Sequence, residues 1–274
     1  MADKTAKIEG DTTLLTSPTI NPPEISIIVP CYNEEQAIQI CIDKIKKVIK
    51  QHNLKSEVIF VNNASTDNSL VILEHNLSGF KELKILNEER RGYGSAYIKG
   101  LAQVQGQYIC MADCDDTYDF GDIPLFIKKL KDHNGVPGAD LVVGNRFEKK
   151  LPSGIMPWHH QYIGNPFLSF LVKLFFKVKI NDIHCGARAI RNTALQKLDL
   201  RTHGMEFASE MIIKCAKLGM KIEEIPITYR IRIGTSKLNS FSDGWRHLRL
   251  ILRYSPLISS LSVFMSSILG IKEK

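Results

Sequence analysis

The chain has 274 residues and a mass of 31.0 kDa, which suits one large α/β domain or two small ones. Hydrophobic residues make up 44% and charged residues 24% of the sequence, ordinary values that exclude a disordered or fibrous protein. The formal net charge of +7 favours a polyanionic partner such as nucleic acid, a phosphorylated substrate or anionic lipid. Because no nucleic-acid-binding module or aromatic-interleaved basic stretch is recognisable, nucleic acid is not the expected partner.

Short apolar runs alternate with amphipathic stretches through the first half of the chain. Residues 1–24 are polar and predict a flexible lead-in. Runs rich in β-branched residues, typical of buried parallel strands, lie at residues 25–30, 58–61, 84–86, 107–112 and 140–144. Apolar residues spaced by three and four predict helices over residues 38–49 and 95–105. This alternation predicts an α/β fold, with a mostly parallel, Rossmann-like sheet covered by helices on both faces.

The second half of the chain is less regular. It contains a strongly apolar helix over residues 162–178 and a clearer amphipathic helix over residues 205–218. Residues 222–233 are expected to be extended with an interruption at Pro226, and residues 245–253 predict a helix with one apolar and one basic face. Residues 256–274 form a short apolar tail interrupted by serines. No run of about 18 uninterrupted apolar residues occurs, so we expect no full transmembrane helix.

The six cysteines show neither CxxC pairs nor a zinc-like spacing. They lie in apolar or small-residue stretches, which is typical of reduced and packed thiols. The polar N-terminal stretch lacks the apolar segment of a signal peptide. We therefore expect the protein in a reducing compartment.

Polar side chains follow four of the predicted strands. In sheets of this kind, ligands bind beyond the carboxyl ends of the strands. The residues in question are Tyr32-Asn33-Glu34, Asn62-Asn63, Asp113-Cys114-Asp115-Asp116 and Asn145-Arg146. Their coincidence predicts a ligand site along one edge of the sheet.

The acidic group is the strongest of these signals. Asp113 and Asp115 are one residue apart, directly after an apolar strand, so both carboxylates can point into one cleft. There they can hold a hard divalent cation, which in turn neutralises a diphosphate. A solvated acidic turn is the alternative, but the position at the ligand edge favours the metal site.

Two further stretches each allow two interpretations. The side chains of Asn62 and Asn63 can read the edge of a base, while Ser65, Thr66 or Asp67 caps the next helix, and these roles are compatible. Residues 91–94 read Arg-Gly-Tyr-Gly before a helix. They resemble part of a phosphate-cradling loop but lack its third glycine. A turn with close backbone approach is the other interpretation, and both stay open.

At this point the sequence resembles a known family. Four motifs occur in the order and spacing of family 2 glycosyltransferases: Pro30-Cys-Tyr-Asn-Glu-Glu35, Asn62 to Asp67, Arg91-Gly-Tyr-Gly-Ser-Ala96 and Asp113-x-Asp115. Further motifs resemble the branch that transfers mannose or glucose to polyprenyl (dolichyl) phosphate: Gly144-Asn-Arg-Phe147, Asp182-Ile-His-Cys-Gly-Ala-Arg188, Glu206-Phe-Ala-Ser-Glu210, Ile225-Pro-Ile-Thr-Tyr229 and Arg232-x-x-x-Ser236-Lys237. The resemblance covers about residues 24–255.

The resemblance implies a GT-A fold and an inverting transfer of a hexose from a nucleotide sugar, of the GDP-mannose or UDP-glucose type, assisted by Mg²⁺ or Mn²⁺. Asp113 and Asp115 would serve the metal and the donor diphosphate. The residues implied against the nucleoside are Pro30, Tyr32, Glu34 and Asn62. Residues 25–145 would form the nucleotide-sugar-binding half of the domain, and residues 146–255 the acceptor-binding half. The family usually has an Asp at position 62 or 63, where this chain has Asn.

The implied acceptor is a polyprenyl phosphate. Arg146, Arg232 and Lys237 would face the phosphates of donor and acceptor. A phosphate monoester is already anionic near neutral pH, so it needs orientation and charge screening instead of a base. Glu210 keeps a sugar or lipid hydroxyl acceptor open as an alternative, because a hydroxyl needs a general base.

Two other classes of protein share some of these features. A nucleotidyltransferase would want a glycine-rich loop bearing a lysine after the first strand, and residues 30–34 are not that loop. A non-catalytic nucleotide-sugar-binding protein with a decayed site is the remaining alternative. The basic helix and the apolar tail predict peripheral attachment at the cytoplasmic face of a membrane.

Overall fold

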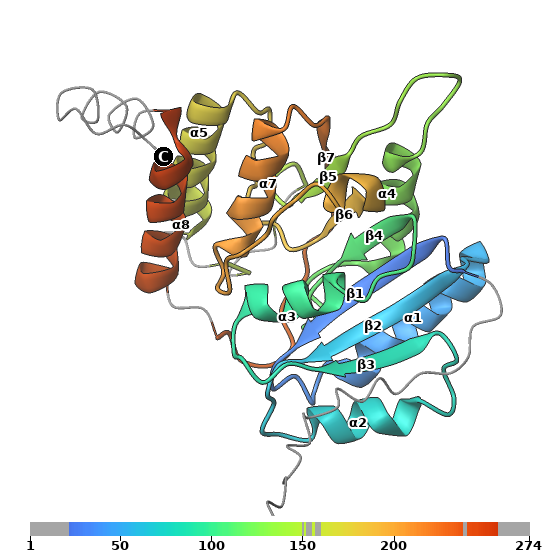
Figure 1. Cartoon of the computed structure of the whole chain (residues 1–274). Helices are drawn as coiled ribbons and strands as arrows, with labels where there is room; N and C mark the ends of the chain where they lie inside the picture. The colour runs from blue at the N-terminus through green and yellow to red at the C-terminus, as the bar shows by residue number, and fades with distance from the viewer. Residues whose placement is uncertain (1–21, 150, 152–154, 157–159, 238–239, 257–274) are drawn as a thin grey trace, which may run out of the picture.

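Figure 1 shows the chain as a computed structural model, which describes residues 22–149, 151, 155–156, 160–237 and 240–256. The expected lead-in over residues 1–24 and the expected tail over residues 256–274 lie almost wholly outside the described residues. They stay predictions, as does the division of the domain into two halves. The six cysteines are buried and free, as the sequence predicts.

A single seven-stranded sheet forms the centre of the molecule, in the order β3-β2-β1-β4-β6-β5-β7 (Figure 1). The strands are β1 (Ile25–Cys31), β2 (Ser56–Asn62), β3 (Leu83–Asn87), β4 (Tyr108–Met111), β5 (Leu141–Asn145), β6 (Arg188–Arg191) and β7 (Ile222–Pro226). Only β6 is antiparallel to its neighbours among these strands. The predicted mostly parallel sheet is therefore confirmed.

β6 is the strand that the sequence does not predict. β6 has four residues, of which only Ala189 and Ile190, between two arginines, are apolar. The strand therefore lacks the apolar run that would predict it. Arg188 is nonetheless fully buried. Its guanidinium donates hydrogen bonds to the backbone carbonyls of Cys185 and Ala208, which satisfies its donors inside the protein. A buried arginine of this kind depends on carbonyls that only the fold supplies.

Helices pack on both faces of the sheet (Figure 1). They are α1 (Ile38–His52), α2 (Ser69–Asn76), α3 (Tyr93–Leu101), α4 (Ile123–Leu130), α5 (Asn165–Phe176), α6 (Asn192–Leu195), α7 (Phe207–Lys217) and α8 (Ser240–Tyr254). A π-helical turn over residues 160–164 precedes α5. The sequence predicts α1, α3, α5, α7 and α8 and, from its capping residues, a helix where α2 lies, but it misses α4 and α6, which have eight residues or fewer. Within the described part of the chain, no helix is long and apolar enough to cross a membrane.

α7 and α8 pack against each other through polar as well as apolar side chains. His247 of α8 is buried, and its Nδ1 lies 2.7 Å from the hydroxyl of Ser209 on α7. The ring of His184 stands edge-on to it, with ring centroids 4.3 Å apart. Burial, together with the nearby Arg188 guanidinium, lowers the pKa of His247 from 6.5 to about 4. The folded protein therefore prefers the neutral imidazole.

This preference predicts how stability depends on pH. As the pH falls from 6.5 to about 4, the unfolded chain binds a proton at residue 247 that the folded protein resists, so the free energy of unfolding decreases. The decrease due to this group is on the order of 3 kcal/mol. Urea unfolding of the native protein and of His247→Gln across this range should show a smaller loss in the variant. Equal losses would contradict the assignment.

Candidate functional site

The carboxyl ends of the central strands meet at one edge of the sheet. Cys31 of β1 pairs with Asn62 of β2, and Ile28 of β1 pairs with Met111 of β4, so the polar residues that follow these strands are neighbours. β5 points the same way as β4, because β6 lies antiparallel between them. Its last residue, Asn145, therefore lies at the same edge. The register of the sheet thus assembles the ligand edge that the sequence predicts.

Two cations meet the acidic residues at this edge. The Arg232 guanidinium forms ion pairs with both Asp115 and Glu34. The Lys237 ammonium lies 2.8 Å from Oε1 of the same glutamate. Asp113 lies two residues before Asp115, directly beyond β4. We call Glu34, Asp113, Asp115, Arg232 and Lys237 the charged cluster; all five are site residues that the sequence predicts.

The segment after β7 brings both cations to the cluster. β7 ends at Pro226, where the sequence predicts an interruption of the extended stretch, and the chain then crosses over the acidic loop. The amide of Ile233 donates to the carbonyl oxygen of Asp115 at 3.0 Å, and the amide of Arg230 donates to that of Thr117 at 2.8 Å. Thr117 in turn donates to Oδ1 of Asp115 from its amide at 3.0 Å and its hydroxyl at 2.6 Å. These bonds fix the Asp115 carboxylate.

Burial and mutual repulsion disfavour ionisation of the carboxyl groups in the charged cluster. Burial raises the pKa of Asp113 to about 7, and the nearby Asp115 carboxylate adds to this rise. Burial also raises the pKa of Glu34, although Lys237 and Arg232 oppose it. Glu34, Asp113 and Asp115 thus face Arg232 and Lys237, and the buried Arg188 guanidinium also lowers the pKa of Asp113. A further cation bound here would lower the repulsion and favour the ionised carboxylates.

The donor set of the cluster fits a hard divalent cation that shares its coordination with a ligand. Among the residues that the structure describes, no group of three or more His, Cys, Asp or Glu side chains is arranged to hold a metal ion. Mg²⁺ commonly takes only one or two carboxylates from a protein and completes its octahedron with phosphate oxygens and water. Asp113 and Asp115 could provide those carboxylates. Such a site would bind metal and a diphosphate together.

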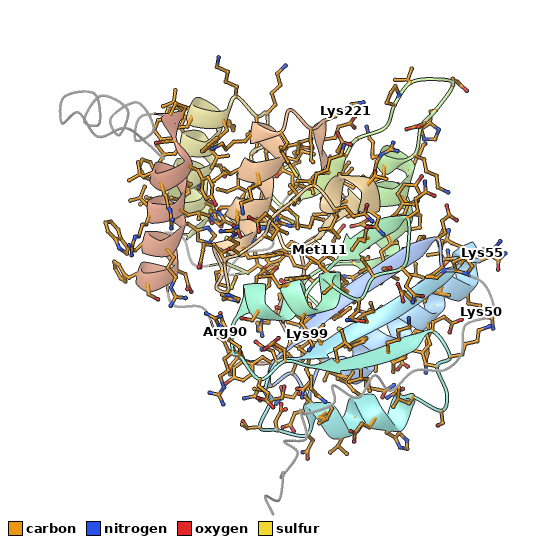
Figure 2. The ribbon with its side chains drawn as sticks, in the orientation of Figure 1. Lys50, Lys55, Arg90, Lys99, Met111 and Lys221 are labelled. Carbon is orange, nitrogen blue, oxygen red and sulfur yellow. The ribbon has the colours of Figure 1, made fainter. Side chains whose placement is uncertain are left out.

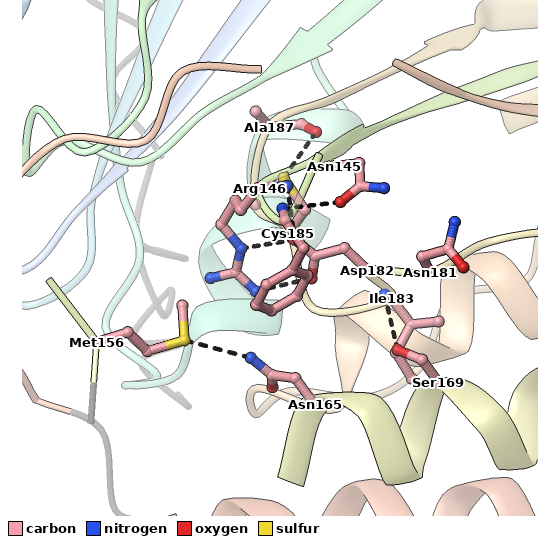
Figure 3. Close-up of polar contacts among 12 residues, drawn as sticks. Asn145, Arg146, Met156, Asn165, Ser169, Asn181, Asp182, Ile183, Cys185 and Ala187 are labelled. Atoms are coloured by element: carbon pink, nitrogen blue, oxygen red, sulfur yellow. Dashed lines mark hydrogen bonds and ion pairs between the residues drawn. The ribbon is translucent and has the colours of Figure 1, made fainter. Parts of the chain in front are cut away.

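Arg146 is not a member of the charged cluster and instead pairs with Asp182 (Figure 3). Its guanidinium forms a bidentate salt bridge with Asp182, in which Nε donates to Oδ2 at 2.7 Å and Nη2 donates to Oδ1 at 2.8 Å. The carboxylate is fully buried and the arginine nearly so. The guanidinium carbon also lies 5.2 Å from the centre of the Tyr229 ring. Asp182 already neutralises this arginine, so its expected role toward phosphate stays a prediction.

The residues expected against the nucleoside lie at the ends of β1 and β2. Pro30 is near the end of β1, and the ring of Tyr32 just beyond it lies 5.2 Å from the Arg91 guanidinium carbon. Asn62 is buried and donates from Nδ2 to Oδ1 of Asn87 at 2.9 Å. The arrangement places an aromatic face and an amide on neighbouring strands. Their contact with a base is a prediction.

Asn63 shows what an asparagine does where the family usually has an aspartate. Its Nδ2 donates to the carbonyl oxygens of Glu88 at 3.1 Å and Arg90 at 2.7 Å, and its Oδ1 accepts from the amide of Gly92 at 2.8 Å. An aspartate has no donor for those carbonyls. The amide therefore holds the loop before α3.

The Arg-Gly-Tyr-Gly motif makes the close backbone approach that the sequence allows, and phosphate binding there stays a prediction. A Cβ added to Gly92 would lie 2.2 Å from the carbonyl oxygen of His203, and one added to Gly94 would lie 2.1 Å from that of Thr202. The φ of Gly92 is +146°, which also disfavours other residues. The His203 carbonyl accepts from the Ser95 amide at 3.2 Å, so the start of α3 is already partnered.

Glu210 is part of the fold's own hydrogen-bond network. Its carboxylate is fully buried, accepts from the amides of Arg201 and Thr202 and from the Thr202 hydroxyl, and pairs with Lys214 at 2.8 Å. Burial raises its pKa, but these hydrogen bonds outweigh burial, so the pKa lies below its usual value. A carboxylate with a lowered pKa and occupied oxygens is a poor general base.

Sequence reasoning missed two partners of the site residues. Lys44 on α1 pairs with Asp116 at 2.5 Å, and Asp182 pairs with Arg146. Lysines recur along the outer face of α1, so nothing in the sequence singles out Lys44. Asp182 is the first residue of one of the motifs on which the family resemblance rests. That position indicates that the residue is important, but it does not identify Arg146 as its partner.

Comparison with known proteins agrees with this geometry. Residues 26–199 match the profile of the family described as glycosyl transferase family 2. The chain belongs to this family. It is 35% identical over 263 residues to the "Low-salt glycan biosynthesis hexosyltransferase Agl6" of Haloferax volcanii, a match that covers 96% of this chain and 61% of that protein. The chain thus spans less than two thirds of this relative's length.

Two further similarities bear on the branch and the fold. The "Dolichyl-phosphate hexose transferase" of the same organism is 27% identical over 221 residues, covering 81% of this chain and 89% of that protein. A crystal structure of glucosyl-3-phosphoglycerate synthase from Mycobacterium tuberculosis superposes with a TM-score of 0.65 at 17% identity, covering 85% of this chain and 80% of that one. The predicted GT-A fold and family are confirmed.

The buried pair of Arg146 and Asp182 gives a stability prediction. Asp182→Ala should lower the free energy of unfolding by about 3–5 kcal/mol, because it leaves the guanidinium buried without its counter-charge. The double variant Arg146→Met with Asp182→Leu removes both charges and should lose clearly less. Urea unfolding at neutral pH measures both. Equal losses of stability in the two variants would contradict the assignment of the cost to an unpaired buried guanidinium.

Proposed function

We propose that the protein transfers a hexose from a nucleotide sugar to a polyprenyl phosphate, with inversion and with the help of Mg²⁺ or Mn²⁺. The observation that carries this proposal is the charged cluster at the ligand edge of the sheet. Its excess of carboxylates suits a cation with a diphosphate, and its two cations suit an anionic acceptor beside them. The hexosyltransferase and dolichyl-phosphate hexose transferase relatives support the same activity.

The residues of the donor side have distinct roles in this proposal. A divalent cation held there would neutralise the charge that develops on the leaving diphosphate. Asp113 and Asp115 hold that cation, and Thr117 keeps the Asp115 carboxylate oriented through two hydrogen bonds. Tyr32 and Asn62 line the space for the nucleoside. These positions lie at strand ends, and sites built on strands are held more precisely than sites built on loops.

The acceptor side favours a phosphate over a hydroxyl. Arg232 and Lys237 lie beside Asp115 and Glu34, where they can orient and screen an anion. An ionised phosphate needs no base, whereas a hydroxyl does. The carboxylate expected to act as that base, Glu210, is engaged elsewhere. The hydroxyl acceptor and the non-catalytic binding protein remain as outcomes of the experiments below.

The proposal includes peripheral attachment to the cytoplasmic face of a membrane. α5 and α8 lie side by side at one end of the molecule (Figure 1). Their large apolar side chains that are more than half exposed are Ile163 (just before α5), Phe167, Phe170, Leu174, Phe241 and Trp245. The first four recur at helical spacing and form one stripe. Arg249 and Arg253 on α8 add exposed positive charge, the combination expected of an interfacial surface.

Transfer to a lipid can be measured directly. Membranes and enzyme are incubated with a panel of labelled nucleotide sugars, with and without Mn²⁺, and label is counted in the organic phase. We expect metal-dependent transfer from one donor and a loss of at least about a hundredfold in Asp115→Asn, because the variant removes a carboxylate from the metal site. Asp43→Asn, an exposed site on α1, is the matched control. Metal-independent transfer, or none from any donor, would overturn the proposal.

Glu210→Gln separates the two acceptor classes. If the acceptor is a phosphate, the variant should lose less than about a hundredfold in kcat, since no general base is removed. Thermal unfolding of the same variant measures the structural cost of weakening its contact with Lys214. A loss of about a hundredfold to ten-thousandfold without a matching drop in Tm would instead indicate a hydroxyl acceptor with Glu210 as base.

A further inference from the structure

A basin of about 350 Å³ opens between the ends of α7 and α8 and the chain that leads into α7. Four of its lining side chains are cations and one is an anion: Lys197, Arg201, Lys214, Lys217 and Asp199. The aromatic ring of Tyr254, the last residue of α8, stands in the same wall. Like charges gathered at this density repel each other, so the basin favours an anionic occupant.

Internal contacts leave part of this charge unbalanced. Arg201 pairs with Asp199 at 2.6 Å, and Lys214 pairs with Glu210 behind the wall. Lys197 and Lys217 have no carboxylate within salt-bridge distance among the residues that the structure describes. The basin therefore presents two cations without counter-ions.

Tyr254 holds two of the basin's lysines in place. Their ammonium groups lie near its ring, with Lys214 Nζ at 5.8 Å and Lys217 Nζ at 5.3 Å from the centroid. Such contacts restrain long side chains that would otherwise spread into solvent. Lys217, which lacks a carboxylate partner, is thus held at the basin beside Lys214, which pairs with Glu210.

The basin is separate from the charged cluster. α7 begins at Phe207, whose ring stacks on Tyr97 with centroids 5.4 Å apart, and the Tyr97 hydroxyl lies 3.4 Å from Asp113. The basin lies at the opposite end of the same helix, at Lys214 and Lys217. Seven to ten residues of α-helix span roughly 10–15 Å. A donor diphosphate at the charged cluster therefore does not fill the basin.

We propose that this basin is a second anion site, which binds a phosphate group. Ammonium and guanidinium groups around one opening are the donors that recognise phosphate oxygens. The source that we expect is the headgroup of an anionic phospholipid, for two reasons. The sequence beyond Tyr254 continues as an apolar stretch from Leu257 to Ile271, and Leu218 at the basin is 54% exposed. Free phosphate is the other source of the same chemistry.

Vesicle binding tests the lipid source. The full chain is sedimented with vesicles of phosphatidylcholine alone and of phosphatidylcholine mixed with phosphatidylglycerol. The double variant Lys197→Gln with Lys217→Gln should bind the anionic vesicles roughly tenfold to thirtyfold more weakly, since each cation near an anionic surface contributes about a fivefold factor. Its binding to neutral vesicles should not change.

Two further variants make the result specific to the basin. Lys47→Gln with Lys50→Gln removes two exposed charges from α1, on the side of the molecule away from α8, where Figure 2 labels Lys50. This matched control should keep full binding to anionic vesicles. Lys197→Arg with Lys217→Arg keeps the charge and should bind as the native protein does. Asp115→Asn should also keep full binding to anionic vesicles, which separates the basin from the proposed transferase activity.

Calorimetric titration with inorganic phosphate tests the free source. Saturable binding that the Lys197→Gln, Lys217→Gln variant loses, with vesicle binding unchanged, would support the site and assign it a soluble phosphate. If neither vesicle binding nor phosphate binding depends on these two lysines, the proposal is overturned. An equal loss in the α1 control overturns it as well, because binding would then follow total charge.

Discussion

The balance of charge at the carboxyl edge of the sheet is the constraint on which the rest of the site depends. Glu34, Asp113 and Asp115 come together with the first and last of them largely buried, and such carboxylates repel one another unless cations join them. Arg232 and Lys237 supply two positive charges, one fewer than the carboxylates. The buried Arg188 guanidinium also acts on Asp113 and lowers its pKa, although burial still raises that pKa to about 7.

This balance requires segments that lie far apart in the sequence. Strand β1 delivers Glu34, strand β4 delivers the two aspartates, and the loop after β7 delivers both cations. The loop is held by backbone hydrogen bonds to the acidic segment, at Asp115 and Thr117. Charge and backbone pairing thus support each other: the hydrogen bonds place the cations, and the ion pairs hold the loop over the sheet edge.

Several residues within recognisable motifs stabilise the fold around this centre. Gly92 and Gly94 let the loop at residues 202–204 approach the start of α3. Asn63 holds the loop before that helix, and Glu210 binds the backbone that leads into α7. These contacts keep the walls of the site in position. A motif can therefore mark the surroundings of a site as well as the groups that contact its ligand.

The sequence by itself determined the class of fold, the strands β1 to β5 and the edge at which polar residues gather, because hydrophobic periodicity and strand ends are local properties. It also singled out every member of the charged cluster. Only the tertiary structure decided their partners: Arg232 bridges Glu34 and Asp115, and Asp182 neutralises Arg146. It also decided that β6, a strand with an arginine at each end, is part of the buried sheet. Ion pairing and the burial of charge depend on distances between remote segments, which no local pattern in a sequence encodes.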